Sequence, residues 1–377
     1  MIYLDNAATS KVCAEAVLAC SFAMTEVFGN PSSLHKLGIE AEKLVVFSKE
    51  QIASALGCAG DEIVFTSGAT ESNNMAILGL CENYGRRKKR IVTTAVEHPS
   101  AYEPFEKLKK MGYEVCVINP DTDGNITKDM LIDAVDDNTC LISAMLVNNE
   151  NGYILPIAKA FKEIKAMYPE CMTHCDCVQG FEKIKIKAKL LCCDTMSISG
   201  HKIYAPKGIG ALYIKKGVRV APLLIGGGQQ KNLRSGTESV PMIYAFGKTV
   251  EALTPTIDER YEYVKGLNEY ARKLISGIDT AVINSPENTS PYILNISLVG
   301  LKSETVLHFL EQSEIYVSSG SACSRGKKSS VLSAFGLNDK RVDSAIRISF
   351  SKDSTMNEID RLCEELDKAV KMLARAR

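Results

Sequence analysis

The sequence has no excess of either charge and no long apolar segment. Its 377 residues include 45 Lys and Arg and 45 Asp and Glu, so the formal net charge is zero. Global electrostatic attraction cannot drive binding to nucleic acid or to an anionic membrane, and we expect neither as a partner. No apolar run approaches the ~20 residues that span a bilayer. The first ten residues lack a basic region followed by an apolar one, so we expect no signal peptide and a cytoplasmic protein.

The sequence also lacks the cysteine spacing of a disulfide framework or a zinc site. The 13 cysteines are odd in number and lie in a long chain, which favours reduced thiols, most of them buried. Cys175 and Cys177 have no second pair at a suitable spacing, and Cys192 and Cys193 are adjacent, so we predict no metal site.

Length and pattern predict two domains, since chains above ~250–300 residues usually exceed one compact core. Strand-like and helix-like segments alternate up to residue 214, which predicts an α/β fold with a mostly parallel sheet covered on both faces. The expected strands are 62–66, 90–94, 113–118, 139–147, 172–175, 195–199 and 210–214, with helices at 69–80, 101–111 and 157–167.

After about residue 250 the pattern changes to that of a smaller α+β domain. The expected elements there are helices at 257–278, 303–312 and 356–374 and strands at 292–298 and 344–350. We therefore predict a large domain at 14–255 and a small domain formed by 1–13 with 256–377.

Three segments of the α/β part could carry chemistry. The segment 66–74 ends a strand and opens a helix with Gly68 and hydroxyl residues, which suits a phosphate, although a plain N-cap is the alternative. Lys202 follows a strand end, where a desolvated lysine can form a Schiff base, although it could instead lie in a surface turn. Asp176 shares a strand face with His174 and could face a cofactor's ring nitrogen.

The fourth segment is the loop 318–326, which contains Cys323 among small polar residues. An exposed thiol in such surroundings is typical of a reactive cysteine, and an incidental thiol is the alternative.

Together these motifs occur in one order along essentially the whole chain. The sequence resembles the pyridoxal-phosphate cysteine desulfurases of the class V aminotransferase group. The most specific parts of the match are the Ser-Gly-His-Lys motif at 199–202 and the Ser-Gly-Ser-Ala-Cys motif at 319–323. The resemblance implies a fold-type-I enzyme with pyridoxal 5'-phosphate as cofactor.

The resemblance also implies roles for residues around the cofactor. Lys202 would bind it covalently and move protons, Asp176 would pair with the ring nitrogen, and Gln179 would meet the ring hydroxyl. His98 would stack on the ring, the alternative being a hydrogen-bonded loop histidine. The remaining cofactor contacts, most of them to the phosphate, would come from Ala69, Thr70, Asn149, Ser199, His201 and, from the neighbouring subunit, Thr237.

The substrate and the partners follow from the same resemblance. Arg347 would bind the carboxylate of L-cysteine with help from Asn149 and Asn30, and the alternative is an exposed strand arginine. Cys323 would attack the substrate sulfur, which leaves alanine and a persulfide. We expect a homodimer with shared active sites and a protein sulfur acceptor, either an iron–sulfur scaffold or a thiolation enzyme.

Other activities stay open from the sequence. A selenocysteine lyase or a class V transaminase could use the same scaffold, but a transaminase has no need of Cys323. A non-catalytic sulfur-carrier subunit is a further alternative, against which Lys202, Asp176 and His98 argue.

Overall fold

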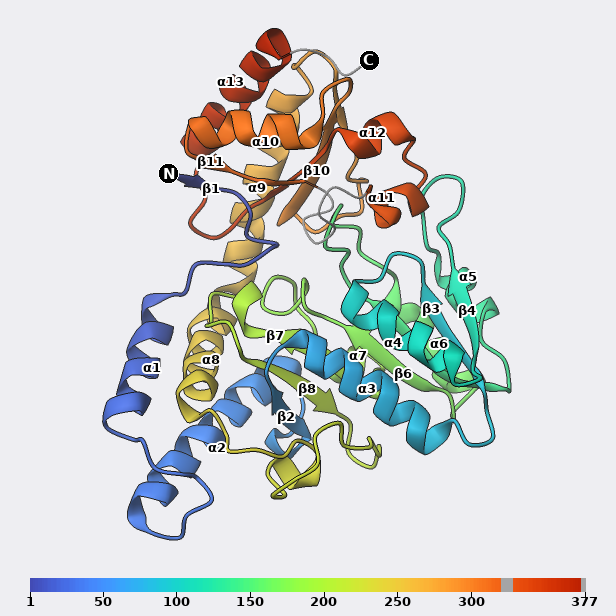
Figure 1. The fold of residues 1–377 in the computed structure, drawn as a ribbon, viewed down its shortest axis with the longest axis vertical. Helices are drawn as coiled ribbons and strands as arrows, with labels where there is room; N and C mark the ends of the chain where they lie inside the picture. Colours follow the sequence, from blue (N-terminus) through green and yellow to red (C-terminus); the bar gives the residue numbers. More distant parts are fainter. Residues whose placement is uncertain (320–327, 374–377) are drawn as a thin grey trace.

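The computed structural model describes residues 1–319 and 328–373, and its centre is a seven-stranded sheet (Figure 1). The strand order is β2-β8-β7-β6-β5-β3-β4. β8 runs antiparallel to β2 and β7, and the other neighbouring pairs are parallel, so the predicted mostly parallel sheet is confirmed. The strands are β2 (Ile63–Thr66), β3 (Arg90–Thr94), β4 (Glu114–Ile118), β5 (Thr139–Met145), β6 (Met172–Asp176), β7 (Thr195–Ser199) and β8 (Gly210–Ile214).

Helices cover both faces of this sheet, because its strands are apolar on both sides. On β8, Leu212 and Ile214 belong to the core beneath α3 and α4, whereas Ala211 and Tyr213 belong to the core shared with α2, α6 and α8. These helices are α2 (Lys36–Leu56), α3 (Ala69–Tyr84), α4 (Pro99–Lys110), α6 (Ile157–Met167) and α8 (Val240–Leu253).

A second, antiparallel sheet has its own hydrophobic core near the C-terminal end of the chain. Its order is β12-β13-β10-β9, and α9, α10 and α13 supply apolar side chains to this core. The elements are α9 (Ile257–Ile275), β9 (Ala281–Ile283), β10 (Ile293–Leu298), α10 (Ser303–Gln312), β12 (Ser318–Ser319), β13 (Ala345–Ser349) and α13 (Met356–Met372). The domain boundaries at 13/14 and 255/256 stay a prediction.

The N-terminus of the chain lies beside this second sheet (Figure 1). β1 (Ile2–Tyr3) pairs in parallel with β11 (Ile315–Tyr316), and Leu4 is buried in the second core. The chain then passes to α1 (Ala14–Thr25), which lies beside α8 (Figure 1), so residues 4–13 lead from the second core to the helices around the central sheet.

The sequence analysis predicted no element at α1, α2 or α8. In α1 apolar residues are spread around much of the helix, so the one-sided periodicity that marks an amphipathic helix is weak. The short elements are α5 (Lys128–Asp133), α7 (Ala188–Leu191), α11 (Ser330–Ala334), α12 (Asp339–Asp343), η1 (Gly60–Glu62), η2 (Gly200–Lys202), η3 (Gln230–Asn232) and η4 (Thr254–Thr256).

Two further expectations concern the cysteines and the membrane. The twelve cysteines in the described ranges are free thiols, seven of them buried and five half-buried. Within 1–319 and 328–373, no helix is long and apolar enough to cross a membrane.

Helices α2 and α8 pack closely because α8 presents a glycine at their crossing. A Cβ at Gly247 would lie 2.7 Å from the backbone Cα of Ser48 on α2. Gly266, in the middle of α9, is different, because a Cβ there would meet no described atom within 4 Å.

We predict opposite effects of alanine at these two helical glycines. Gly247→Ala should lower the free energy of unfolding by about 1–3 kcal/mol, since backbone must move to admit the methyl group. Gly266→Ala should raise it by up to about 1 kcal/mol, because alanine has the higher helix propensity. Urea denaturation of both variants tests this, and equal effects would contradict the packing described.

Candidate active site

A cavity of about 760 Å³ lies at the carboxyl ends of the parallel strands, where α/β sheets bind ligands. The loops after β2, β3, β5, β6 and β7 and residues 7–9 line it, and Arg347 reaches it from β13. The sequence-predicted residues that the structure brings together here are Ala69, Thr70, His98, Asn149, Asp176, Gln179, Ser199, His201, Lys202 and Arg347.

Lys202 enters the cavity from η2, directly after β7. Its ammonium group donates hydrogen bonds to the backbone oxygens of Ala7 and Ala8, both at 2.7 Å. The N-terminal segment therefore holds this amine at the cavity wall, and the alternative of a lysine in a surface turn does not apply.

Asp176 ends β6 with a side chain that is 5% exposed. Its Oδ1 accepts from Val178 N at 3.0 Å, and its Oδ2 accepts from Asn73 Nδ2 at 2.8 Å. His174 contacts the same Asn73, whereas Cys175 and Cys177 lie in the core with their sulfur atoms 3.5 Å apart. The two-residue alternation predicted for this strand is thus present.

Two histidines of the cavity are held neutral. Burial lowers the pKa of His98, which caps α4 and accepts a hydrogen bond from Ser100 N at 3.1 Å. Burial, with a contribution from the charge of Lys202, lowers the pKa of His201 to about 4. Both imidazole rings are therefore uncharged near neutral pH, so neither adds a positive charge next to Lys202.

The side-chain amide of Gln179 is held by one hydrogen-bond acceptor and one hydrogen-bond donor. Its Nε2 donates to Ala7 O at 3.0 Å, and its Oε1 accepts from Lys183 Nζ at 2.7 Å. Burial lowers the pKa of Lys183 to about 7. The sequence analysis gave Lys183 no role, because nothing in the pattern marks a lysine as buried.

Arg347 is 4% exposed, so the alternative of an exposed strand arginine is wrong. One terminal nitrogen donates to Asn149 O at 2.9 Å, and the other pairs with Asp5 Oδ1 at 2.9 Å. Its Nε is buried and has no partner among the described residues. The guanidinium therefore keeps one buried N–H donor that no described residue uses.

One end of the cavity fits a phosphate group. Ala69 and Thr70 open the 16-residue helix α3 and line the cavity, so the unpaired N–H groups of its first turn point there. Gly68 precedes them at φ 154° and ψ 178°, a conformation that essentially only glycine adopts. Ser199 Oγ is buried with no hydrogen-bond partner in the described chain, and it is a further donor for an anion.

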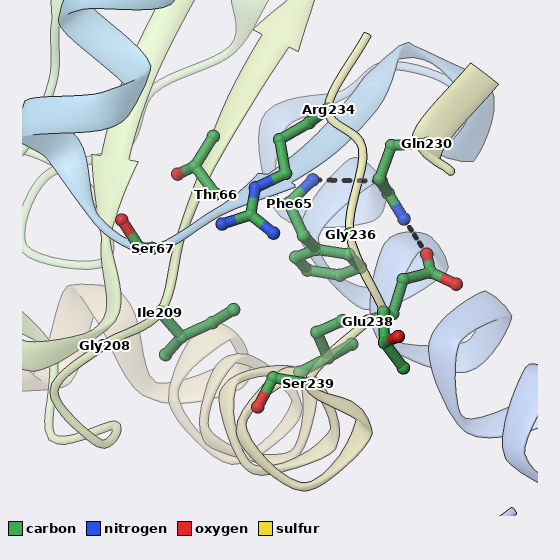
Figure 2. Close-up of a pocket in the computed structure, with 12 residues that line it drawn as sticks. Phe65, Thr66, Ser67, Gly208, Ile209, Gln230, Arg234, Gly236, Glu238 and Ser239 are labelled. Atoms are coloured by element: carbon green, nitrogen blue, oxygen red, sulfur yellow. Dashed lines mark hydrogen bonds between the residues drawn. The ribbon is translucent and has the colours of Figure 1, made fainter. Parts of the chain in front are cut away.

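Two predicted residues lie outside this cavity. Asn30 and Thr237 line a neighbouring hollow together with Met24, Phe28 and Pro241. Figure 2 shows how the segment before α8 is anchored: Gln230 accepts from Phe65 N at 3.1 Å and donates to Glu238. Cys323, the third predicted catalytic residue, lies outside the described residues.

Glu97 is a buried carboxyl beside His98 that lies outside the cavity lining. Its Oε1 accepts from Thr94 Oγ1 at 2.6 Å and from Met145 N at 3.0 Å, and its Oε2 has no described partner. Burial raises the pKa of Glu97 to about 8. The folded protein therefore keeps this group protonated at pH values where the unfolded chain ionises it.

This shift predicts a pH-dependent loss of stability that a Glu97→Gln variant should lack. Because the folded pKa of about 8 lies above the ordinary 4.5, the parent protein should lose stability relative to Glu97→Gln as the pH rises from 4.5 to about 8. Denaturation midpoints across this range measure the effect. Glu82→Gln, on the exposed face of α3, is the matched control, and equal pH dependence in Glu97→Gln and the parent would contradict the assignment.

Comparison with known proteins identifies the family of the chain. The family model Aminotransferase class-V matches residues 2–362. The NifS/IcsS protein homolog of Lactobacillus delbrueckii is 40% identical, with 98% of this chain and 97% of the relative covered. The cysteine desulfurase IscS of Dictyoglomus turgidum is 37% identical, covering 99% and 95%. A solved NifS-like protein superposes with a TM-score of 0.93 at 33% identity, covering 99% and 100% of the two chains. The chain belongs to the class-V aminotransferase family.

Proposed function

We propose that the protein is a pyridoxal-phosphate-dependent cysteine desulfurase, which converts L-cysteine to L-alanine and a persulfide on Cys323. The observation that carries the proposal is the convergence of Lys202, Asp176, His98 and Arg347 on one cavity. The relatives named cysteine desulfurase give the reaction, and the cavity supplies an amine, a buried carboxylate, a neutral histidine and a carboxylate receptor for it.

The described residues fit the cofactor at both ends. The α3 N-terminus and Ser199 would bind the phosphate, while Asp176 would hold the proton of the ring nitrogen and His98 would lie against the ring. Lys202 would provide the amine that attaches the cofactor and would move protons at the substrate. When bound, pyridoxal phosphate supplies the electron sink for the reaction.

The substrate carboxylate would bind Arg347, whose Nε is the buried donor without a described partner. Asn149 lies next to it, because its backbone oxygen accepts from the same guanidinium. This pair would orient L-cysteine with its amino group toward the end of β6 and β7, where Lys202 and Asp176 lie.

The sulfur then moves to the protein. The Cys323 thiolate attacks the sulfur of L-cysteine, a sulfur–sulfur bond forms, and the carbon–sulfur bond breaks with its electron pair left on carbon. That carbon takes up a proton and becomes the methyl group of alanine. The persulfide would pass to a protein acceptor, either an iron–sulfur scaffold or a thiolation enzyme, in the cytoplasm, whose reducing conditions suit the free thiols.

A homodimer with shared sites accounts for Asn30 and Thr237. The hollow that they line adjoins an exposed apolar surface on α1 and the following loop. Several exposed apolar side chains on one helix and the loop after it favour a protein interface, and a symmetric dimer would bury them on both subunits. The side chains exposed there include Val17, Leu18, Phe22, Met24, Phe28 and Leu34. A second copy would place Asn30 and Thr237 beside its partner's cavity.

We predict that Lys202→Ala and Cys323→Ser both lower alanine formation from L-cysteine to background, because one removes the cofactor attachment and the other the sulfur nucleophile. Alanine and protein persulfide are measured together after incubation with L-cysteine. Cys192→Ser, which replaces a half-buried thiol outside the cavity, is the matched control and should keep parent activity.

Two outcomes would contradict the proposal. Parent-like alanine formation in Cys323→Ser would exclude this cysteine as the sulfur nucleophile. Amino transfer that survives in Cys323→Ala, without sulfide release from the parent, would indicate a transaminase instead.

A further inference from the structure

Asn73 lies on α3, one turn beyond the helix start, and its side chain is fully buried. Its three polar contacts reach residues of β6 and α4 that are far away in the sequence. Oδ1 lies 3.1 Å from His174 Nε2, and Nδ2 donates to Asp176 Oδ2 at 2.8 Å and to Ser100 Oγ at 2.9 Å. The amide uses both of its N–H groups and its oxygen.

The direction of these hydrogen bonds is determined by chemistry. A carboxylate only accepts, so the amide nitrogen of Asn73 must face Asp176. Burial lowers the pKa of His174 to about 3, so its ring is neutral and one nitrogen donates. That donor is Nε2–H, facing the amide oxygen, while Nδ1 accepts from Thr195 Oγ1 at 2.9 Å. A flipped amide would place its oxygen against the Asp176 carboxylate and lose that hydrogen bond.

The second branch leads from Asn73 to His98. Ser100 N donates to His98 Nδ1 at 3.1 Å, so this nitrogen carries a lone pair and no proton. Ser100 Oγ accepts from Asn73, and its own proton points to His98 Nδ1 at 2.8 Å. Neutral His98 therefore carries its proton on Nε2. The charged groups that act on His98 are Asp176, Lys202 and Arg347.

We propose that Asn73 is a positioning residue that acts on two groups of the cofactor site at once: it donates directly to the carboxylate of Asp176, and through the hydroxyl of Ser100 it orients the ring of His98. The inference rests on the proposed function for the identity of the cofactor. His174 in turn fixes the orientation of Asn73, so the chain of bonds runs from the interior of the sheet to the cavity.

The test compares Asn73→Ala with Asn83→Ala, the same substitution on the exposed end of the same helix. Loss of the donor makes the Asp176 carboxylate more basic, so it would draw the ring proton toward itself, and the ring would withdraw less charge from the nitrogen that joins the cofactor to Lys202. The pH midpoint of the cofactor's visible absorbance should move upward by about 0.5–1 unit in Asn73→Ala. It should stay unchanged in Asn83→Ala.

Kinetics separate positioning from substrate binding. In Asn73→Ala, kcat for alanine formation should fall about 10–100-fold with KM for L-cysteine little changed, because the contacts of Arg347 remain. Ser100→Ala interrupts only the His98 branch. In this variant the acidic limb of the plot of kcat against pH should move to higher pH. The pH midpoint of the cofactor's visible absorbance should stay unchanged.

The outcomes are decisive in each case. Parent-like absorbance and pH profiles in Asn73→Ala would overturn the inference. If Asn73→Ala does not retain the cofactor, Asn73→Leu, which keeps the volume but not the donor to Asp176, takes its place, and a parent-like absorbance midpoint in that variant overturns the inference. If the parent protein makes no alanine from L-cysteine, the proposed function fails, but the absorbance midpoint with bound pyridoxal phosphate still tests Asn73.

Discussion

The buried carboxylate of Asp176 is the constraint on which the site depends, because a buried charge costs free energy unless hydrogen-bond donors surround it. One donor is the backbone of Val178, and the other is Asn73 on α3. The helix must therefore lie across the end of β6. Asn73 follows the start of α3 by four residues, or about 6 Å along the axis, so the same helix also brings its N-terminus to the phosphate end of the cavity.

The N-terminal segment contacts residues from both sheets and so holds the two sides of the cavity together. Asp5 pairs with Arg347 of the second sheet, while the backbone oxygen of Ala7 accepts from Gln179 and Lys202, which follow β6 and β7 of the first sheet. Residues 5–7 thus set the position of Arg347, the proposed carboxylate receptor, relative to the proposed cofactor residues Gln179 and Lys202. The position of this segment is held by backbone pairing of β1 with β11, so the geometry of the cavity depends on chain segments more than 300 residues apart in sequence.

The sequence pattern predicted the sheet, the 66–74 turn, Asp176 and Lys202, because at strand ends the apolar alternation stops and polar residues follow. The other cavity residues were predicted from the family resemblance. It could not assign Asn73, since a polar residue in the first turns of a helix looks like part of a cap. Lys183 was missed because burial of a lysine leaves no mark in the pattern. Asn30 and Thr237 lie outside the cavity of their own subunit, so their predicted roles depend on a second copy that a single sequence does not position.

The central claim is that Lys202 is the attachment point of the cofactor, although Lys207 also lines the cavity and Lys183 lies buried beside Gln179. Borohydride reduction of the protein with bound pyridoxal phosphate, followed by peptide mapping, measures this directly. The account predicts a pyridoxyl group on Lys202 alone. A label on Lys183 or Lys207, or no label on any lysine, would contradict it.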